Sequence, residues 1–273
     1  MFSHLKHSAT VASSISIATS AKKFQHEKNN QAFCNPSLLI QPGIFGVIST
    51  FKLKNHEKCS DDIAKSAELQ LIHSIIEEYK HKDLHIEFYL TSGISSTSDY
   101  FVRVHGKELI CVQNFLLDFK NRSQLGKSSE VKQTFIGVSR PLNYITPAKS
   151  VELNSSLFAT TYSSGPPKYA IVVPVKKNAK WWNLSDSERL AMTEEHTRAT
   201  LFGLKSVKRK LYHSTGLDDV DFITYFETDD LLAFQELMLA LVKVKENTHH
   251  VRWGEPTIVA AIKSIDEIVD VLL

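Results

Sequence analysis

The pentapeptide Tyr89-Leu90-Thr91-Ser92-Gly93 returns 123 residues later as Tyr212-His213-Ser214-Thr215-Gly216. After one residue of slippage in the turn, the likeness continues from residues 99–109 onto residues 221–231. Working outward, each copy begins upstream with an apolar run typical of a strand, at residues 45–53 and at residues 169–177. The repeat predicts that the chain consists of two similar units.

Each copy has the pattern strand, helix, strand, tight turn, strand, helix, strand, which is typical of a ferredoxin-like unit with an antiparallel sheet. Between the copies, prolines and a glycine stand among many Ser and Thr residues, as in an interdomain connection. We therefore predict an α+β fold in which two tandem ferredoxin-like halves form a subunit of the dimeric α+β-barrel type. The predicted parts are an N-terminal half at 37–145, a linker at 146–168 and a C-terminal half at 169–273. Chance similarity of two short αβ segments is the alternative.

Residues 1–36 differ in composition from the rest of the chain. A short basic start precedes a mildly apolar run of small residues at 9–18, and Thr19-Ser20-Ala21 then offers a small-x-small cleavage site. Serines and a threonine interrupt the apolar run, so the segment is predicted to be either a weak signal peptide or a disordered leader.

The composition excludes several classes of protein. With 32 basic and 30 acidic residues the formal charge is +2, so no field exists that would collect nucleic acid or anionic lipid. No stretch approaches the roughly 18 to 20 apolar residues of a membrane-spanning helix. Cys34, Cys59 and Cys111 are far apart and form no CxxC pair, which argues against a cysteine zinc site or a disulfide framework. Histidine, with twelve residues, is the enriched ligand type.

The second copy carries the candidate functional residues. Its first helix is predicted to begin at Ser185, with Glu188 at the spacing of a capping box. His196 shares one face of this helix with Arg189 and Met192, because they recur at three- and four-residue spacing. His196 is thus expected on a regular helix that faces the sheet.

A strand predicted at 207–213 places Arg209 on the same face as Val207 and Leu211. A guanidinium on an apolar strand face is costly unless an anion or a cofactor meets it. The next strand, predicted at 221–227, would close the same pocket with three side chains of one face, namely Phe222, Thr224 and Phe226.

A helix-borne histidine that faces a sheet pocket suits the proximal ligand of a haem, in which one ring nitrogen binds iron and the other is anchored. A satisfied surface histidine, and an arginine held in an ion pair, remain the alternatives. The repeat aligns His73 with His196 but places Ile86 opposite Arg209. This difference favours the second copy as the site.

Several longer runs closely resemble the chlorite dismutase family in its long-chain, respiratory form. The likeness is dense from residue 169 to the C-terminus and looser from residue 41 to residue 145. The runs that carry it are His196-Thr197, residues 207–219, 221–231, 244–247 and 251–254, Gln41-Pro42-Gly43, and Leu142-Asn143-Tyr144-Ile145.

The resemblance implies a role for each matching residue. His196 would be the proximal ligand of haem b, Glu246 would accept a hydrogen bond from its other ring nitrogen, and Arg209 would stand over the distal face of the iron. Lys177 would hold the haem propionates by charge. The remaining matches are haem-edge positions at Asn143, Tyr144, Ile145 and Trp181, proximal aromatics at Trp182 and Trp253, and the distal wall at Leu211, Thr224 and Phe226. Core packing is the alternative for Trp182 and Trp253.

The resemblance also implies the reaction, which is conversion of chlorite to chloride and dioxygen by oxygen-atom transfer to ferric iron and O–O bond formation. Arg209 would hold the chloro-oxygen anion during the reaction. The alternatives are a haem-binding or sensor protein, a porphyrin decarboxylase of the same superfamily, and a barrel domain without haem. Arg209 argues against the decarboxylase. The resemblance also implies a periplasmic homo-oligomer, with a pentamer as the form expected by analogy with the family.

Overall fold

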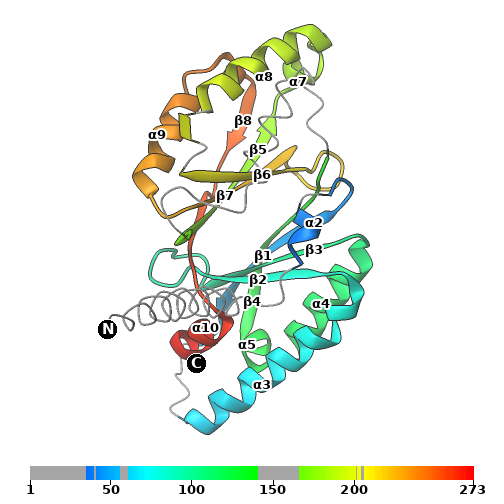
Figure 1. The fold of residues 1–273 in the computed structure, drawn as a ribbon, viewed down its shortest axis with the longest axis vertical. Coiled ribbons are helices and arrows are strands. Elements are labelled where there is room, and N and C mark those ends of the chain that lie inside the picture. The colour runs from blue at the N-terminus through cyan, green and yellow to red at the C-terminus, as the bar shows by residue number, and fades with distance from the viewer. Residues whose placement is uncertain (1–34, 40, 56–60, 141–165, 201, 204–205) are drawn as a thin grey trace, which may run out of the picture.

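Two antiparallel sheets, one from each copy of the repeat, form the frame of the computed structural model (Figure 1). The structure describes residues 35–39, 41–55, 61–140, 166–200, 202–203 and 206–273. The predicted leader and nearly all of the predicted linker lie outside these ranges. Asn143, Tyr144 and Ile145 also lie outside the described residues.

The first half follows the predicted order of elements, and its sheet runs β4-β1-β3-β2 with antiparallel neighbours. Its elements are α2 (Pro36–Leu39), β1 (Phe45–Leu53), α3 (Asp62–Glu78), η1 (Lys80–Lys82), β2 (His85–Leu90), β3 (Tyr100–Gly106), α4 (Leu109–Arg122), α5 (Gln124–Lys127) and β4 (Ser129–Val138).

The second half repeats this arrangement, with β6, β7 and β5 adjacent and with β8 and β9 on the other edge of β5. Its elements are β5 (Tyr169–Lys177), α7 (Ala179–Trp182), α8 (Asp186–Thr200), β6 (Val207–His213), β7 (Phe222–Thr228), α9 (Leu231–Leu241), η3 (Lys245–His249), β8 (His250–Trp253), β9 (Ile258–Ile262) and α10 (Ile265–Leu272). The predicted fold of two ferredoxin-like halves is confirmed.

The hairpin turns of the two halves are built alike. A carboxylate oxygen of Asp99 accepts a hydrogen bond from the backbone N–H of Leu53, at 2.8 Å. The carboxylate of Asp221 accepts one from the backbone N–H of Lys177, at 2.7 Å. The glycine that ends each aligned pentapeptide has a φ of +81°, a backbone conformation that residues with a Cβ rarely adopt. Shared hydrogen bonds and shared backbone geometry make chance similarity untenable.

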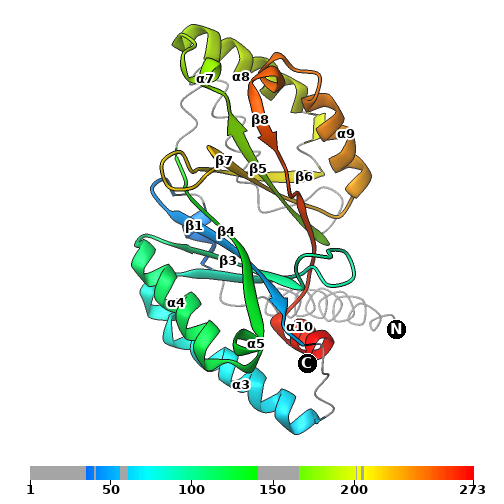
Figure 2. The same cartoon turned by 180° about the vertical axis from the view of Figure 1, so that it is seen from behind.

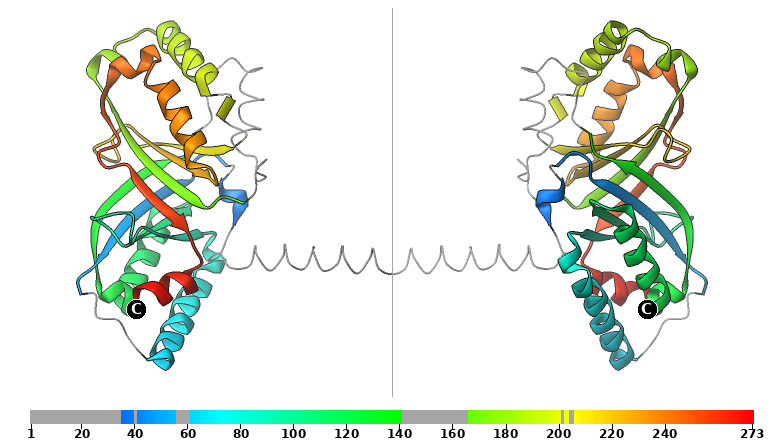
Figure 3. Two further views of the ribbon diagram at one scale, coloured as in Figure 1. Left: turned by 90° about the vertical axis from the view of Figure 1, so that its left-hand side faces the viewer. Right: turned by 90° about the vertical axis from the view of Figure 1, so that its right-hand side faces the viewer.

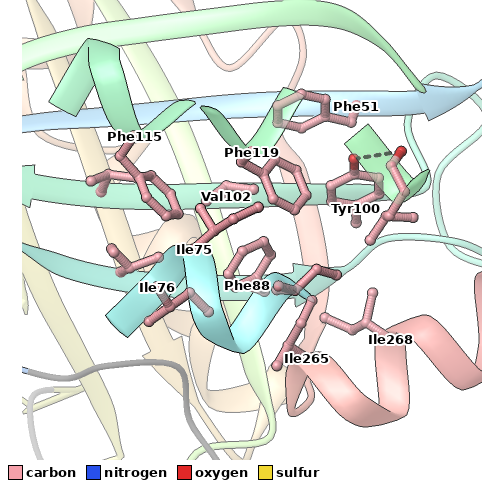
Figure 4. Close-up of a cluster of buried hydrophobic side chains, with 14 of the residues drawn as sticks. Phe51, Ile75, Ile76, Phe88, Tyr100, Val102, Phe115, Phe119, Ile265 and Ile268 are labelled. Carbon is pink, nitrogen blue, oxygen red and sulfur yellow. Dashed lines mark hydrogen bonds between the residues drawn. The ribbon is translucent and has the colours of Figure 1, made fainter. Parts of the chain in front are cut away.

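Side chains of the strands alternate between two apolar layers. In the first half, Ile86, Phe88 and Val102 face the helices and pack with Phe115 and Phe119 of α4 (Figure 4). The intervening residues face inward, where both halves contribute to an inner core. Its members include Ile48, Tyr89, Phe101, Ala170, Tyr212 and Tyr225.

The two sheets join edge to edge and close into a barrel. Val138 of β4 pairs with His213 of β6 on one side. On the other side, Tyr89 and Leu90 of β2 pair with Ile262 and Ala261 of β9. Because β5 also pairs with β7, the order of strands returns to its start. The subunit is thus a closed barrel with helices outside.

The last helix belongs by its packing to the first half. Figures 2 and 3 show the chain passing from the upper half into the lower half, where it ends in α10. Ile265, Ile268, Val269 and Leu272 of α10 are buried in the core that α3 and α4 cover, and Figure 4 shows two of them beside Phe88. The predicted C-terminal half ran to residue 273, whereas the packing assigns α10 to the other half. Pairing of β9 with β2 is what carries the chain across.

No helix among the described ranges is both long enough and apolar enough to span a membrane. Cys111 is unpaired and partly buried against the outer core of the first half. Cys34 and Cys59 fall outside the described residues.

Candidate functional site

The two halves differ in how their first helix meets the sheet. In the first half, α3 buries Ile72, Ile75 and Ile76 directly against the strands. In the second half, α8 buries only Thr200. Since α8 has no apolar stripe to fill the space, a cavity of about 700 Å³ remains, lined by α8 together with sheet residues.

The cavity brings together all ten predicted site residues that the structure describes. Those that line it are His196, Arg209, Lys177, Glu246, Trp181, Trp182, Trp253, Leu211, Thr224 and Phe226. Residues separated by 76 positions in the chain therefore meet in one site. A mostly apolar cavity with a few convergent polar groups is typical of a ligand or cofactor site.

A capping box fixes the start of α8. The Ser185 hydroxyl donates to Glu188 at 2.6 Å, the Ser185 backbone N–H donates to the same carboxylate at 2.8 Å, and the Glu188 N–H donates to the Ser185 hydroxyl at 3.3 Å. The predicted capping box is confirmed. It satisfies N–H groups that the first turn leaves free, and His196 follows three turns later.

One nitrogen of the His196 ring is held by Glu246, and the other faces the cavity and Arg209. Its Nδ1 lies 2.7 Å from Oε2 of Glu246, which lies in η3. Its Nε2 lies 3.1 Å from Nη1 of Arg209. Because Nδ1 donates its proton to the carboxylate, Nε2 keeps the lone pair and directs it to the cavity. The predicted contact between His196 and Glu246 is present.

Lys177 stands behind this pair. Its ammonium donates to Oε1 of Glu246 and contacts Nε2 of His250 at 2.7 Å, and it lies 4.2 Å from the ring centre of Trp181. The resemblance implied that its charge would hold propionates, but here Glu246 already compensates that charge. The reason lies in the strand register, since Lys177 of β5 pairs with His250 of β8, next to η3.

Burial and charge set the ionisation of this group. Burial would raise the pKa of the Glu246 carboxyl, but hydrogen bonds from His196 and Lys177 and their charges hold that pKa well below its usual range. Burial and the neighbouring Lys177 charge lower the pKa of His250 to about 4. At neutral pH the site therefore holds a carboxylate and a neutral His250.

Arg209 lies on β6 and is half-buried, with its guanidinium beside His196. Its neighbours across the sheet follow from the register, in which Arg209 pairs with Phe226 and Leu211 pairs with Thr224. Its Nε has no hydrogen-bond partner among the described residues. Burial lowers the pKa of the guanidinium, and the Glu246 charge opposes that effect. A cation with a buried, unmet donor marks a place where the protein would hold an anion.

The three tryptophans have different surroundings. Trp181 is buried under the Lys177 ammonium, whereas Trp182 is 44% exposed and stacks on Phe222 with ring centres 6.2 Å apart. Trp253 packs partly against the core of the second half and contacts the His250 ring at 5.3 Å between centres. Core packing thus accounts for part of the surroundings of Trp253 and for none of those of Trp182.

The equivalent positions of the first half form no such site. The His73 side chain is 52% exposed and pairs with Asp266 at 2.8 Å. Ile86 is fully buried in the core. The prediction that the second copy carries the site agrees with this placement.

Sequence reasoning missed three titratable side chains of the cavity, which are His250, His213 and Arg140, whereas Arg189 was expected on the helix face of His196. His250 adjoins the run at 251–254 that carried part of the resemblance, and His213 lies within the repeated pentapeptide. Neither position has a periodic signal of its own. The β5–β8 and β6–β4 pairings bring them to the site.

Comparisons with known proteins agree with this geometry. The sequence model of the family described as Chlorite dismutase matches residues 65–263. The chain belongs to the chlorite dismutase family. A chlorite dismutase from Ideonella dechloratans is 46% identical over 236 residues, which cover 86% of this chain and 82% of that protein.

Solved members of the chlorite dismutase family have the same fold. The enzyme from Candidatus Nitrospira defluvii in complex with imidazole is 38% identical, with a TM-score of 0.79 over 86% of this chain and 98% of that chain. A variant of the same enzyme gives 37% identity and a TM-score of 0.80. A coproheme decarboxylase from Mycolicibacterium smegmatis is more distant, at 25% identity over 66% of this chain and 74% of that protein.

The residues of the cavity suit the haem that this family implies. The lone pair of His196 Nε2 faces the cavity, and its only close contact among the described residues is the guanidinium of Arg209. In the first half, apolar residues of α3 fill the equivalent space between helix and sheet. The helix α8 has no such residues, so its side of the sheet keeps room for a cofactor. A group bound at Nε2 would take the place of the Arg209 contact, so the guanidinium must withdraw to admit it.

Proposed function

We propose that this chain is a haem b enzyme that converts chlorite to chloride and dioxygen. The observation that carries the proposal is the anchored imidazole of His196 facing the guanidinium of Arg209 in one cavity. The family membership and the 46% identity to a chlorite dismutase support it. The distant coproheme decarboxylase is the source of the main alternative.

Haem, when bound, supplies a ferric iron at which chlorite can bind and give up an oxygen atom. His196 Nε2 would hold the iron. The aromatic and apolar cavity residues would enclose the ring, together with Asn143, Tyr144 and Ile145 as the resemblance implies.

Glu246 and Lys177 act on the imidazole from behind. A carboxylate that accepts the Nδ1 proton fixes the tautomer and makes Nε2 a stronger donor. The Lys177 ammonium keeps that carboxylate ionised and oriented, since it binds the second oxygen of Glu246. Lys177 is therefore a positioning residue, which acts on His196 through Glu246.

Arg209 acts on the opposite side. Its guanidinium offers several N–H donors and a full charge to a small oxyanion. By holding the chlorine-containing anion in the cavity, Arg209 would favour formation of dioxygen over escape of an oxidant. Leu211 and Phe226 narrow the space beside it, which favours small anions over larger substrates.

The same resemblance supports a periplasmic location and a homo-oligomer, with a pentamer as the form we propose. The signal-like composition of residues 1–36 supports export. Sedimentation equilibrium of the purified protein measures the number of subunits, and fractionation of the native host measures the location.

The first experiment is to add chlorite to the purified, haem-loaded protein in a dioxygen electrode. Rapid evolution of dioxygen in a near one-to-one yield with chlorite consumed is the expected result. No dioxygen from a protein whose haem spectrum is intact would overturn the proposal. Incubation with coproheme and peroxide, followed by mass analysis of the porphyrin, tests the decarboxylase alternative on the same sample.

A further inference from the structure

A second group of potential ligands lies inside the barrel, apart from the cavity at α8. His85 and Glu87 are two residues apart on β2, and His105 stands directly opposite His85 on β3. Since side chains alternate along a strand, all three occur on the inner face that meets the other half. None of them lines the cavity that holds His196.

The geometry of these three side chains is compact. Each offers one ligand atom such that the three atoms lie within 4.8 Å of one another. All three side chains are buried, with exposed fractions of 2% for His85, 7% for Glu87 and 0% for His105. The two imidazole rings have centres 5.4 Å apart. Small rotations of the rings would bring the three atoms around a single ion.

The imidazoles leave nitrogen atoms unsatisfied. Among the described residues, neither ring nitrogen of His85 has a hydrogen-bond partner, and Nδ1 of His105 has none. His85 Nε2 lies 3.0 Å from Oε2 of Glu87 but is not aligned for a hydrogen bond. Buried polar atoms are ordinarily paired, so three such atoms in one cluster call for a partner that the protein itself does not supply.

The neighbouring side chains orient the cluster. His105 Nε2 lies 2.6 Å from the hydroxyl of Tyr212, which belongs to the other half. If that nitrogen donates to the hydroxyl, Nδ1 carries the lone pair, and this is the arrangement found around metal-binding histidines. Tyr212 would then link an ion held by the first half to β6 of the second half.

Arg103 and two carboxylates set the local charge. The Nε and Nη2 atoms of Arg103 both donate to Oε2 of Glu87. The guanidinium therefore binds a single oxygen of this carboxylate and does not form a bidentate pair with both. Arg103 also reaches Glu227 at 3.3 Å and stacks over the ring of Tyr225, at 3.6 Å from its centre. Lys210 is a second cation whose charge reaches His105 and Arg103, so the two carboxylates are balanced and the ligand atoms themselves must hold an added ion.

We propose that His85, Glu87 and His105 form a second metal site inside the barrel, which binds one divalent metal cation of the zinc class. Two imidazoles and one carboxylate are a common ligand set for such ions, and a carboxylate already held by an arginine is an ordered ligand. The ion would tie β2 to β3 and, through Tyr212, brace the first half against the second.

Zinc binding to the purified, haem-loaded protein tests the proposal, because zinc is distinguished from haem iron by elemental analysis. After treatment with a chelator, the protein is equilibrated with dilute zinc, desalted and analysed by mass spectrometry of the elements. We expect about one zinc ion per chain and a rise in the unfolding temperature when zinc is added.

Three variants locate the ion. His85→Gln and Glu87→Gln are expected to lower the zinc content at least tenfold, while His73→Gln, at an exposed histidine paired with Asp266, keeps the wild-type content. The intensity of the haem spectrum and the circular dichroism show whether each variant has folded. Equal zinc loss in all variants, or retention in the first two, would place the ion elsewhere and overturn the site.

X-ray absorption at the zinc edge gives a test that needs no variant. The wild-type protein should show imidazole scattering from two rings and nitrogen or oxygen ligands at about 2.0–2.2 Å. A wild-type protein that holds no zinc after desalting would overturn the proposal outright. A spectrum with sulfur ligands, or with no imidazole, would do the same.

Discussion

At the scale of single residues, the site depends on a series of charged and polar side chains in contact with one another. Lys177, Glu246 and His196 contact one another in sequence, and Arg209 closes the other end at Nε2. A buried ion is stable only while its partner remains, so removing one member affects the others. The two ends of this series nevertheless have separable functions.

Replacing His196 with Ala should remove the haem, because the imidazole of His196 is anchored by Glu246 at Nδ1 and presents Nε2 to the cavity. The measurement is the haem absorbance per chain after purification with added haem. His73→Ala is the matched control and should leave that ratio unchanged, since its side chain is exposed and paired with Asp266. Haem loss in the His73 variant would mean that the first copy holds the site.

Replacing Arg209 with Ala should keep the haem but lower dioxygen production by roughly 10²-fold, which is typical of the loss of one strong electrostatic donor. Haem bleaching per chlorite consumed should also become faster. Arg209→Lys keeps the positive charge but loses the planar set of guanidinium donors, so its dioxygen production should fall between those of wild type and Arg209→Ala. Full activity together with full haem lifetime in Arg209→Ala would contradict the anion-holding role.

Acid should destabilise the protein through His250. Its pKa is about 4 when folded, compared with an ordinary value of 6.5, because burial and Lys177 oppose its protonation. The unfolded chain therefore binds the proton first, and stability falls as the pH drops from 6.5 towards 4. The urea midpoint measured at pH 7.5 and at pH 5 should differ less in His250→Gln than in wild type, while His73→Gln keeps the wild-type difference.

At the scale of elements, α8 combines a functional position with little packing. Only Thr200 of this helix is buried, and its contacts are mainly with α9 and η3. A helix that lacks an apolar face depends on its caps for stability. The same lack of packing leaves the space that a cofactor needs, so the functional and the structural property have one cause.

Removing the capping hydroxyl with Ser185→Ala should cost about 1 kcal/mol and should speed haem loss, because His196 is carried by the same helix. Transfer of haem to an excess of apomyoglobin measures that loss. Ser264→Ala removes the equivalent capping box of α10 and is the matched control. It should lower the unfolding free energy to a similar extent with no effect on haem transfer. Equally fast haem transfer from both variants would contradict the link to α8.

At the scale of the whole molecule, the barrel is closed by few strand pairs and secured by its C-terminus. One residue pair joins β4 to β6, and two join β2 to β9. Beyond β9, α10 inserts into the core of the first half (Figure 4). The two halves should therefore unfold together.

Ile268→Ala should lower the free energy of unfolding by about 2–5 kcal/mol, because the fully buried side chain leaves a cavity in the core of the first half. Val271→Ala on the same helix should change it by less than about 0.5 kcal/mol, since that residue is 48% exposed. Urea unfolding followed by fluorescence and by circular dichroism measures both. Two separate transitions, with only one shifted by Ile268→Ala, would show that the halves unfold independently.

The sequence by itself determined those elements and residues whose conformation depends only on a few neighbouring residues. The strand at 207–213, the capping box at Ser185 and the turn glycines depend on period and backbone conformation within a few residues. The repeated pentapeptide extended this to the fold, because two copies of one pattern predict two copies of one unit. The difference between Ile86 and Arg209 then identified the copy with the site.

Only the tertiary structure decided which distant residues share a contact. The β5–β8 register places Lys177 on Glu246 and His250 instead of leaving its charge free, and the β2–β9 pairing carries α10 into the first half. Likewise, the inner faces of β2 and β3 bring His85 to His105. Strand register is set by side-chain packing summed over the whole barrel, so no local pattern in the sequence encodes it.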